Sequence, residues 1–232
     1  MSESGNVYAF DESIPLDPIP VGTTVMVAGP AFSPAEDLAQ ALVTAGSERS
    51  EGMLFISTGM TAGKLLGSCR GFRPSLDVSR LAIIDCSGQE IGKLDAGARV
   101  KYVSTQSDLT GIGMKFSALY ESLYNDADGG RIRTGLESLS SLAMYVDLRK
   151  LFRFSQTLSS RIDSADGLGV FSIDPSTHDE QTLSTLSQAV DARIEVRDPE
   201  LETNADGELR VRGLRGQPDG WQPFTLPGSD DA

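Results

Sequence analysis

Apolar and polar positions alternate along this chain with two periods, one typical of strands and one typical of helices. Short runs rich in β-branched and other apolar residues predict seven strands, with helical patterns between them. These strands are expected at 23–28, 52–57, 80–85, 99–104, 131–137, 167–173 and 192–197. Because strands that alternate with helices form βαβ units, we expect an α/β fold in three layers, with a mostly parallel central sheet.

Two amphipathic patterns predict long helices between these strands. The first has an apolar stripe at Phe116, Leu119, Tyr120 and Leu123. The second has an apolar side with Leu148, Leu151, Phe152 and Ile162. Its other side is basic and carries Arg149, Lys150, Arg153 and Arg161. A basic stripe of this kind is either a solvated face, the simpler interpretation, or a binding site for a partner.

Two further segments are placed at the starts of helices. Residues 177–180 match a capping box with acidic residues in the first turn, so a third helix is expected to begin there. His178, the only histidine, lies in this box, and a surface role is therefore favoured over a catalytic one. Residues 108–113 form a glycine-flanked loop before the first helix, which is either a functional loop or a plain connector.

The C-terminal part of the chain has a different character. After the turn-rich segment 198–207, residues 208–213 and 221–226 read as two strands. We expect them to form an antiparallel hairpin at one edge of the sheet. The polar ends, residues 1–13 and 227–232, are expected to be flexible and acidic, which leaves a single domain over 14–226.

Composition narrows the possible partners and surroundings. Twenty basic and thirty-three acidic residues give a net charge of −13. This balance disfavours a nucleic-acid surface, because binding to phosphate backbones depends on Lys and Arg. It is also typical of a halophilic, archaeal protein that stays dissolved in a salty cytoplasm, and the alternative is an ordinary acidic bacterial or archaeal protein.

Cysteine usage and apolar runs point to a cytoplasmic protein without a metal. Cys69 and Cys86 are the only cysteines and have no CxxC spacing, so neither zinc nor a disulfide framework is indicated. The apolar runs are far shorter than the ~20 residues that cross a bilayer. The acidic N-terminus has no apolar segment of the signal-peptide type, so no contact with a membrane is expected.

The first strand runs through a glycine turn into a helix, the place where a phosphate-binding loop would lie. Against the pattern GxxxxGK[ST], only Gly29 matches. Pro34 stands at the second glycine, Ala35 at the lysine and Glu36 at the residue that would hold magnesium. Three positions of the motif have therefore changed together.

Each change removes a physical contribution to phosphate binding. Pro34 has no backbone N–H and cannot adopt a positive φ, and Ala35 brings no charge to the phosphates. Glu36 adds a negative charge where a triphosphate would lie. Residues 33–36 instead match an S-x-x-E capping box with proline at the first helical position, which predicts that side chains cap this helix.

Several segments in this order resemble the KaiC-like branch of the RecA-type ATPases. They are Ile19-Pro20-Val21-Gly22-Thr23, Gly29-Pro30, Gly52–Ser57, Leu136-Glu137-Ser138-Leu139-Ser140 and Gly167–Asp174. The resemblance covers about residues 14–215 and implies a RecA-like domain. It also implies that the degenerate nucleotide loop comprises Gly29, Pro30, Ala31, Ser33, Pro34, Ala35 and Glu36.

The same resemblance places two further catalytic positions. The second strand of relatives usually ends on the acids that activate water, whereas Thr58 and Gly59 follow it here. Glu137 aligns with the Walker B aspartate. It is either a displaced magnesium ligand or an ordinary acid at the end of a strand or at a helix cap. No catalytic residue is therefore assigned.

These observations favour a catalytically inactive pseudo-ATPase that serves as a protein-interaction or regulatory module. Its expected partners are proteins, with a second copy or an active paralogue among the possibilities, and no cofactor is required. The alternative is a nucleotide-binding protein or slow ATPase that uses ATP and Mg²⁺ through an altered loop. DNA binding, as in recombinases, is disfavoured by the net charge and by the lack of an aromatic–basic cluster in the sequence.

Overall fold

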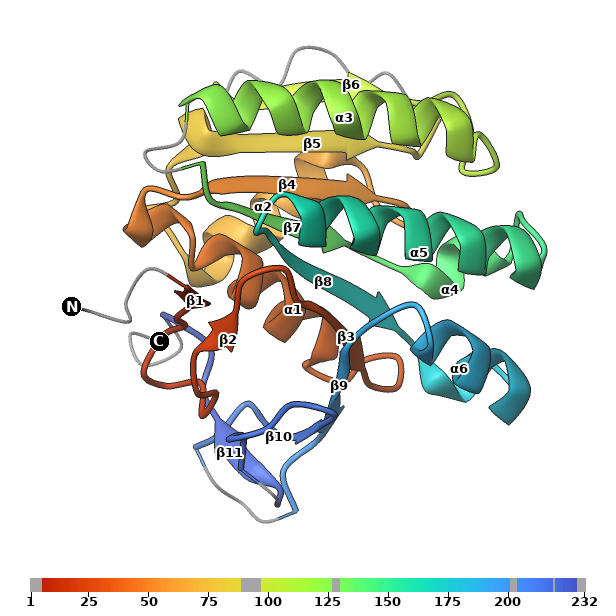
Figure 1. The fold of residues 1–232 in the computed structure, drawn as a ribbon. Coiled ribbons are helices and arrows are strands. Elements are labelled where there is room, and N and C mark those ends of the chain that lie inside the picture. Colours follow the sequence, from red (N-terminus) through yellow and green to blue (C-terminus); the bar gives the residue numbers. More distant parts are fainter. Residues whose placement is uncertain (1–5, 89–96, 127–129, 201–203, 219, 229–232) are drawn as a thin grey trace.

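The computed structural model describes residues 6–88, 97–126, 130–200, 204–218 and 220–228. The chain folds into three layers (Figure 1): α1 and α2 cover one face of the central sheet, and α3 to α6 cover the other. The α/β fold expected from the alternating periods is confirmed. The described part contains no helix long and apolar enough to cross a membrane.

The large sheet has nine strands in the order β11-β10-β9-β3-β8-β7-β4-β5-β6. All pairings from β9 to β6 are parallel, and those that involve β10 are antiparallel. The parallel strands are β3 (Thr24–Ala28), β4 (Gly52–Ser57), β5 (Leu81–Asp85), β6 (Arg99–Tyr102), β7 (Ile132–Leu136), β8 (Leu168–Ile173) and β9 (Ala192–Arg197). Every predicted strand is present, with ends shifted by at most two residues.

The C-terminal hairpin is confirmed at one edge of the sheet. It consists of β10 (Gly207–Arg212) and β11 (Gln222–Phe224), and β10 pairs with β9. Burial alternates residue by residue along β9 and β10, whereas β3, β4 and β8 are buried throughout. The hairpin therefore leaves one face exposed, while the central strands are covered on both faces.

The helices are α1 (Ala35–Thr44), α2 (Ala62–Phe72), α3 (Leu109–Asp126), α4 (Leu139–Ala143), α5 (Leu148–Ser164) and α6 (Glu180–Ser187). The expected loop at 108–113 is wrong, because α3 already begins at Leu109 and Asp108 accepts a hydrogen bond from the Gly111 N–H at 2.8 Å. The capping box expected at 177–180 is also wrong. Asp179 caps α6 by accepting from the Thr182 N–H at 2.7 Å.

On α5, the basic side is exposed as expected, but the buried side is turned slightly from the predicted stripe. Leu151 and Ile162 are buried, whereas Leu148 and Phe152 lie at the margin and Phe154 and Leu158 fill the centre.

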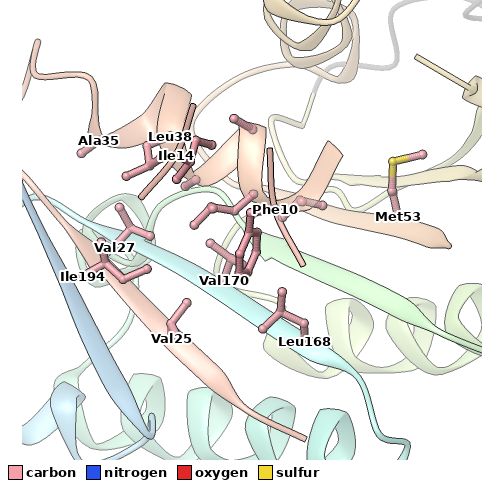
Figure 2. Packing of buried hydrophobic residues seen from close by; sticks show 14 of the residues in the cluster. Phe10, Ile14, Val25, Val27, Ala35, Leu38, Met53, Leu168, Val170 and Ile194 are labelled. Atoms are coloured by element: carbon pink, nitrogen blue, oxygen red, sulfur yellow. The ribbon is translucent and has the colours of Figure 1, made fainter. Parts of the chain in front are cut away.

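The buried apolar side chains form two clusters, one on each face of the sheet. Figure 2 shows the cluster beneath α1, where Val25 and Val27 of β3 meet Val170 of β8 and Leu38 of α1. Phe10 from the N-terminal segment packs into the same cluster. The second cluster lies beneath α3 to α6 on the opposite face.

The flexible N-terminus expected over 1–13 is wrong for its described part, residues 6–13, which we call the N-terminal strap. Its strand β1 (Val7–Tyr8) pairs with β2 (Ile19–Pro20), and Tyr8 is completely buried. The side chain of Arg133 donates to the Ala9 carbonyl at 2.7 Å and lies over the ring of Tyr8. Residues 1–5 and 229–232, also expected to be flexible, lie outside the described residues.

Arg133 is a charged residue within the buried strand β7, and its contacts explain how it is accommodated there. Its side chain has no exposed surface, and its Nε donates to the Glu51 carboxylate at 2.5 Å. A further hydrogen bond of 2.8 Å goes to the Leu42 carbonyl. Each of the three guanidinium nitrogens therefore has a hydrogen-bond acceptor inside the protein, which stabilises the buried charge.

Candidate functional site at the carboxyl edge of the sheet

Three segments singled out in the sequence meet where the parallel strands end. They are the loop after β3 (residues 29–34), the pair Thr58-Gly59 after β4 and Glu137 after β7. Because parallel strands place their carboxyl ends at one edge of the sheet, this edge is where α/β folds bind ligands.

The loop after β3 folds tightly against the start of α1. A Cβ atom on Gly29 would lie 2.5 Å from the Cβ of Ala35 and 2.7 Å from the Ser33 Oγ. No side chain fits at Gly29, so this glycine is explained by close packing of the loop itself. Its match to the first glycine of a phosphate-binding loop thus has a local structural reason.

Phe32 stands out at the tip of this loop. Its ring is fully exposed, and its φ of 67° lies in the left-handed region that bulky residues avoid. Pro30 and Ala31 lead into this turn, and the Ser33 N–H donates to the Pro30 carbonyl at 3.1 Å. The loop is therefore a closed turn that holds an apolar side chain out to solvent.

The capping box expected over 33–36 is wrong. Pro34 occupies the N-cap position instead of the first helical position, and no side chain caps α1. The Ser33 Oγ is buried without a hydrogen-bond partner among the described residues. The proline ring turns the chain before the helix, and so the Ser33 hydroxyl does not reach the first helical N–H groups.

Acidic side chains surround the start of α1. Partial burial, together with repulsion from Glu137, Asp37 and Asp174, raises the pKa of Glu36 above its ordinary value. Glu36 and Glu137 both border an enclosed space of about 10 Å³ between α1 and the sheet, a volume that suits a single water molecule. The potential at this point disfavours an anion.

Glu137 turns its carboxylate onto the end of β4. One oxygen, Oε2, accepts hydrogen bonds from the Thr58 N–H at 2.7 Å and from the Gly59 N–H at 2.5 Å. A Cβ on Gly59 would lie 3.0 Å from the other oxygen, so a larger residue here would press against the carboxylate. Burial raises the pKa of Glu137 despite these hydrogen bonds. The carboxylate thus links the carboxyl ends of the neighbouring strands β7 and β4.

A second acid at this edge, Asp85, was missed by the sequence analysis. It ends β5, is buried, and accepts hydrogen bonds from the Ala62 N–H at 2.7 Å and the Ser87 N–H at 2.9 Å. A signal was available, because an aspartate after an apolar strand often binds backbone N–H groups of the next turn. Its carboxylate holds the start of α2 against the sheet.

The single histidine also reaches this edge. The Nε2 of His178 lies 2.9 Å from the Ser140 Oγ, which in turn accepts from the Asp174 N–H at 3.0 Å. These contacts tie α4 to the turn that precedes α6. The partner of His178 was not foreseen, since the two residues are 38 positions apart.

Metal and thiol chemistry find no support in the described part of the chain. No group of three His, Cys, Asp or Glu side chains within it is placed to hold a metal ion. Cys69 and Cys86 are both buried as free thiols, and burial raises the pKa of each to about 12. Neither thiol is therefore available as a thiolate at neutral pH.

The edge hairpin carries an aromatic–basic cluster that the sequence analysis did not detect. The guanidinium groups of Arg197 and Arg210 lie 4.2 and 4.5 Å from the centre of the Trp221 ring. Both are paired with acids, Arg197 with Glu208 at 2.7 Å and Arg210 with Glu195. The cluster is thus largely neutralised within the protein and offers little charge to a nucleic acid.

Comparison with known proteins agrees with this architecture. The model of a family of unknown function, DUF7504, matches residues 22–196. The chain belongs to the DUF7504 family. The matched segment runs from the turn before β3 into β9 and so includes all three parts of the carboxyl edge, while the strap and the hairpin lie outside it.

A solved structure extends the comparison beyond this family. The chain is similar in fold to a KaiC-like protein from the hyperthermophilic archaeon Pyrococcus horikoshii OT3, with a TM-score of 0.65. The similarity covers 96% of this chain and 94% of the other, at 13% sequence identity. No curated protein matches the sequence. The RecA-like, KaiC-like fold expected from the sequence is thereby confirmed.

Proposed function

We propose that this DUF7504 protein is a pseudo-ATPase, a KaiC-like domain that binds partner proteins without hydrolysing ATP. The contact between Glu137 and the N–H groups after β4 carries the proposal. In an ATPase of this fold, a carboxylate at this position would have to face magnesium. Here the same carboxylate is used to join two strands.

The loop after β3 supports the same conclusion. Pro34 offers no N–H at the start of α1, and Glu36 places a carboxylate beside Glu137. A magnesium–triphosphate would need donors and cations at this place. The residues present are therefore unsuited to that group. As part of the proposal, the protein acts in the cytoplasm of a salt-adapted archaeal cell.

Titration of the purified protein with Mg-ATP and Mg-ADP tests the proposal. We expect no heat of binding and no thermal shift up to millimolar nucleotide in high-salt buffer. Saturable binding below about 100 μM would contradict it and favour the alternative, a slow ATPase with an altered loop.

A restored loop serves as the matched control. The triple variant Pro34→Gly, Ala35→Lys and Glu36→Thr returns the N–H group, the cation and the hydroxyl of a phosphate-binding loop. Because Glu137 remains turned away, we expect this variant to bind nucleotide weakly and to release no phosphate.

A further inference from the structure

The tip of the loop after β3 presents an open apolar surface. Three consecutive apolar residues, Pro30, Ala31 and Phe32, are exposed there. The ring of Phe32 is fully exposed, so it is not packed against the rest of the described chain. A run of exposed apolar residues is unfavourable in water, and it is expected where another molecule covers it.

The backbone at Phe32 is also strained. Its φ of 67° belongs to the left-handed region, which glycine, asparagine and aspartate adopt more readily than a bulky residue. Strain of this kind occurs most often at binding sites and active sites. Because the exposed ring gains no packing, the free protein shows no compensation for a phenylalanine at this position. Contact with another molecule supplies such a compensation.

The loop holds Phe32 in a fixed place. The Ser33 N–H donates to the Pro30 carbonyl at 3.1 Å and closes the turn. Behind the loop, a Cβ on Gly207 of β10 would lie 2.5 Å from the Cγ of Pro34, so the hairpin packs directly against the loop. An aromatic side chain on a braced turn loses little conformational freedom when it is bound.

The first turn of α1, directly after the loop, is acidic. Glu36 and Asp37 are both accessible to solvent, and neither forms an ion pair within the described part of the chain. Partial burial raises the pKa of both carboxyl groups, and the neighbouring charges that raise them further are those of other acids, among them Glu137 and Asp206. Cations of a partner can therefore pair with this turn without first displacing an ion pair of the protein.

Arg197 is the cation at the end of the adjacent strand β9. It pairs with Glu200 at 2.6 Å and with Glu208 at 2.7 Å, and it lies 4.2 Å from the centre of the Trp221 ring. Its charge is thus used within the hairpin. The first turn of α1 keeps its negative charge, and charge complementarity then requires a cationic partner.

We propose that residues 30–32, together with Glu36 and Asp37, form a docking surface for a partner protein whose binding segment is cationic and has an apolar notch. Phe32 enters the notch, and arginine or lysine side chains beside it pair with the two acids. An aromatic anchor in a pocket, with a polar rim around it, is a common arrangement in protein interfaces. This inference rests on the proposed role in protein binding, and it adds the surface and the chemistry of the partner.

The probe is a synthetic helical peptide of about 18 residues, or about five turns. It carries leucines along one side, a central alanine that leaves a notch among them, and arginines on both flanks. A second peptide, with glutamate at every arginine position, is its control. In amide NMR spectra of the labelled protein, we expect the basic peptide to shift residues 29–37 saturably, with Kd below about 1 mM, and the acidic peptide to shift none. No binding of the basic peptide, or shifts centred elsewhere, overturns the proposal.

Phe32→Asn tests the aromatic anchor. Asparagine suits the positive φ, so the protein stays folded while its affinity for the basic peptide is expected to fall at least about tenfold. The matched control, Met114→Asn, removes a 70% exposed apolar side chain from α3 and should leave the affinity unchanged. Undiminished binding by Phe32→Asn, or an equal loss in both variants, contradicts the proposed anchor.

The double variant Glu36→Gln and Asp37→Asn tests the charges. It is expected to weaken binding of the basic peptide at least about threefold, because two ion pairs are lost. Its matched control, Glu12→Gln and Glu121→Gln, neutralises two exposed acids in the strap and on α3 and changes the net charge equally. An equal loss in both double variants would mean that long-range charge attracts the peptide, which overturns the proposed location.

Sedimentation of the free protein tests whether a second copy occupies this surface. Self-association that Phe32→Asn abolishes would assign the surface to a second copy and overturn the proposal, whereas a monomer agrees with a different partner. None of these assays contains nucleotide. Their failure is therefore distinguishable from failure of the pseudo-ATPase proposal, which the Mg-ATP titration decides separately.

Discussion

The Oε2 of Glu137 lies 2.5 Å from the backbone nitrogen of Gly59. This contact joins the ends of β7 and β4, which are neighbours in the sheet although the two residues are 78 positions apart. The same oxygen also accepts from the N–H of Thr58 at 2.7 Å. An acid at the carboxyl edge of a parallel sheet thus serves the fold itself.

The first prediction concerns the carboxylate of Glu137. Since the Thr58 and Gly59 N–H groups both donate to one oxygen, Glu137→Gln retains these two hydrogen bonds and is expected to lower the free energy of unfolding by less than about 1 kcal/mol. Glu137→Ala leaves buried N–H groups without an acceptor and should cost about 2–3 kcal/mol. Urea unfolding of both variants checks this. Equal costs would argue against the hydrogen-bonding role.

Glu137 also predicts a dependence on pH. Burial raises the pKa of Glu137 in the folded protein. The contribution of this group to the free energy of unfolding is therefore largest below the ordinary glutamate pKa, and it is lost as pH rises through the pKa of the folded state. Glutamine does not ionise. The stability of Glu137→Gln relative to the unmodified protein should therefore increase as pH rises from about 4 to 7. A constant difference across this range would contradict the prediction.

The second prediction concerns the pair formed by Arg133 and Glu51. Replacement of Arg133 by methionine leaves the buried Glu51 with only its longer contact to Arg131, at 3.6 Å, and it should cost about 3–5 kcal/mol. The double variant Arg133→Met and Glu51→Leu should recover much of this loss, because both members of the fully buried pair are then apolar. Denaturant unfolding measures both. A double variant as unstable as the single one would show that the strap contacts of Arg133 dominate.

The third prediction concerns a buried hydroxyl. The Thr134 Oγ1 has no hydrogen-bond partner among the described residues, so Thr134→Val should leave the melting temperature unchanged or raise it. Thr58→Val is the matched control, since the Thr58 hydroxyl donates to the Ser138 carbonyl at 2.8 Å. We expect the control to cost about 1–2 kcal/mol.

The fourth prediction concerns the strained turn at Phe32. Asparagine adopts positive φ more readily than phenylalanine, and the ring of Phe32 has no packing to lose. Phe32→Asn should therefore raise the free energy of unfolding by up to about 1 kcal/mol, whereas Phe32→Val should lower it. Thermal unfolding distinguishes the two. A loss of stability in Phe32→Asn would mean that the exposed ring has an intramolecular role.

Local patterns predicted the elements of the fold well, and the ends of helices poorly. The runs at 52–57 and 192–197 became β4 and β9 without a shift. β4 is buried on both faces and reads as a continuous apolar run, whereas β9 is buried on one face and alternates. The starts of α1, α3 and α6 were misplaced. At α3 and α6 the start depends on which nearby polar side chain reaches the first N–H groups, Asp108 and Asp179 respectively. At α1 the turn at Pro34 leaves no side chain in that place.

The sequence by itself determined the α/β layout, the edge hairpin and the net negative charge. Only the tertiary structure decided where Glu137 and Arg133 direct their charges, and that the strap is part of the core. Periodicity reports which face of an element is buried. It carries no information on which distant backbone groups a buried charge will meet, such as Glu51, 82 positions from Arg133. That pairing follows from the order of the strands, and it supplies the buried guanidinium of Arg133 with a hydrogen-bond acceptor.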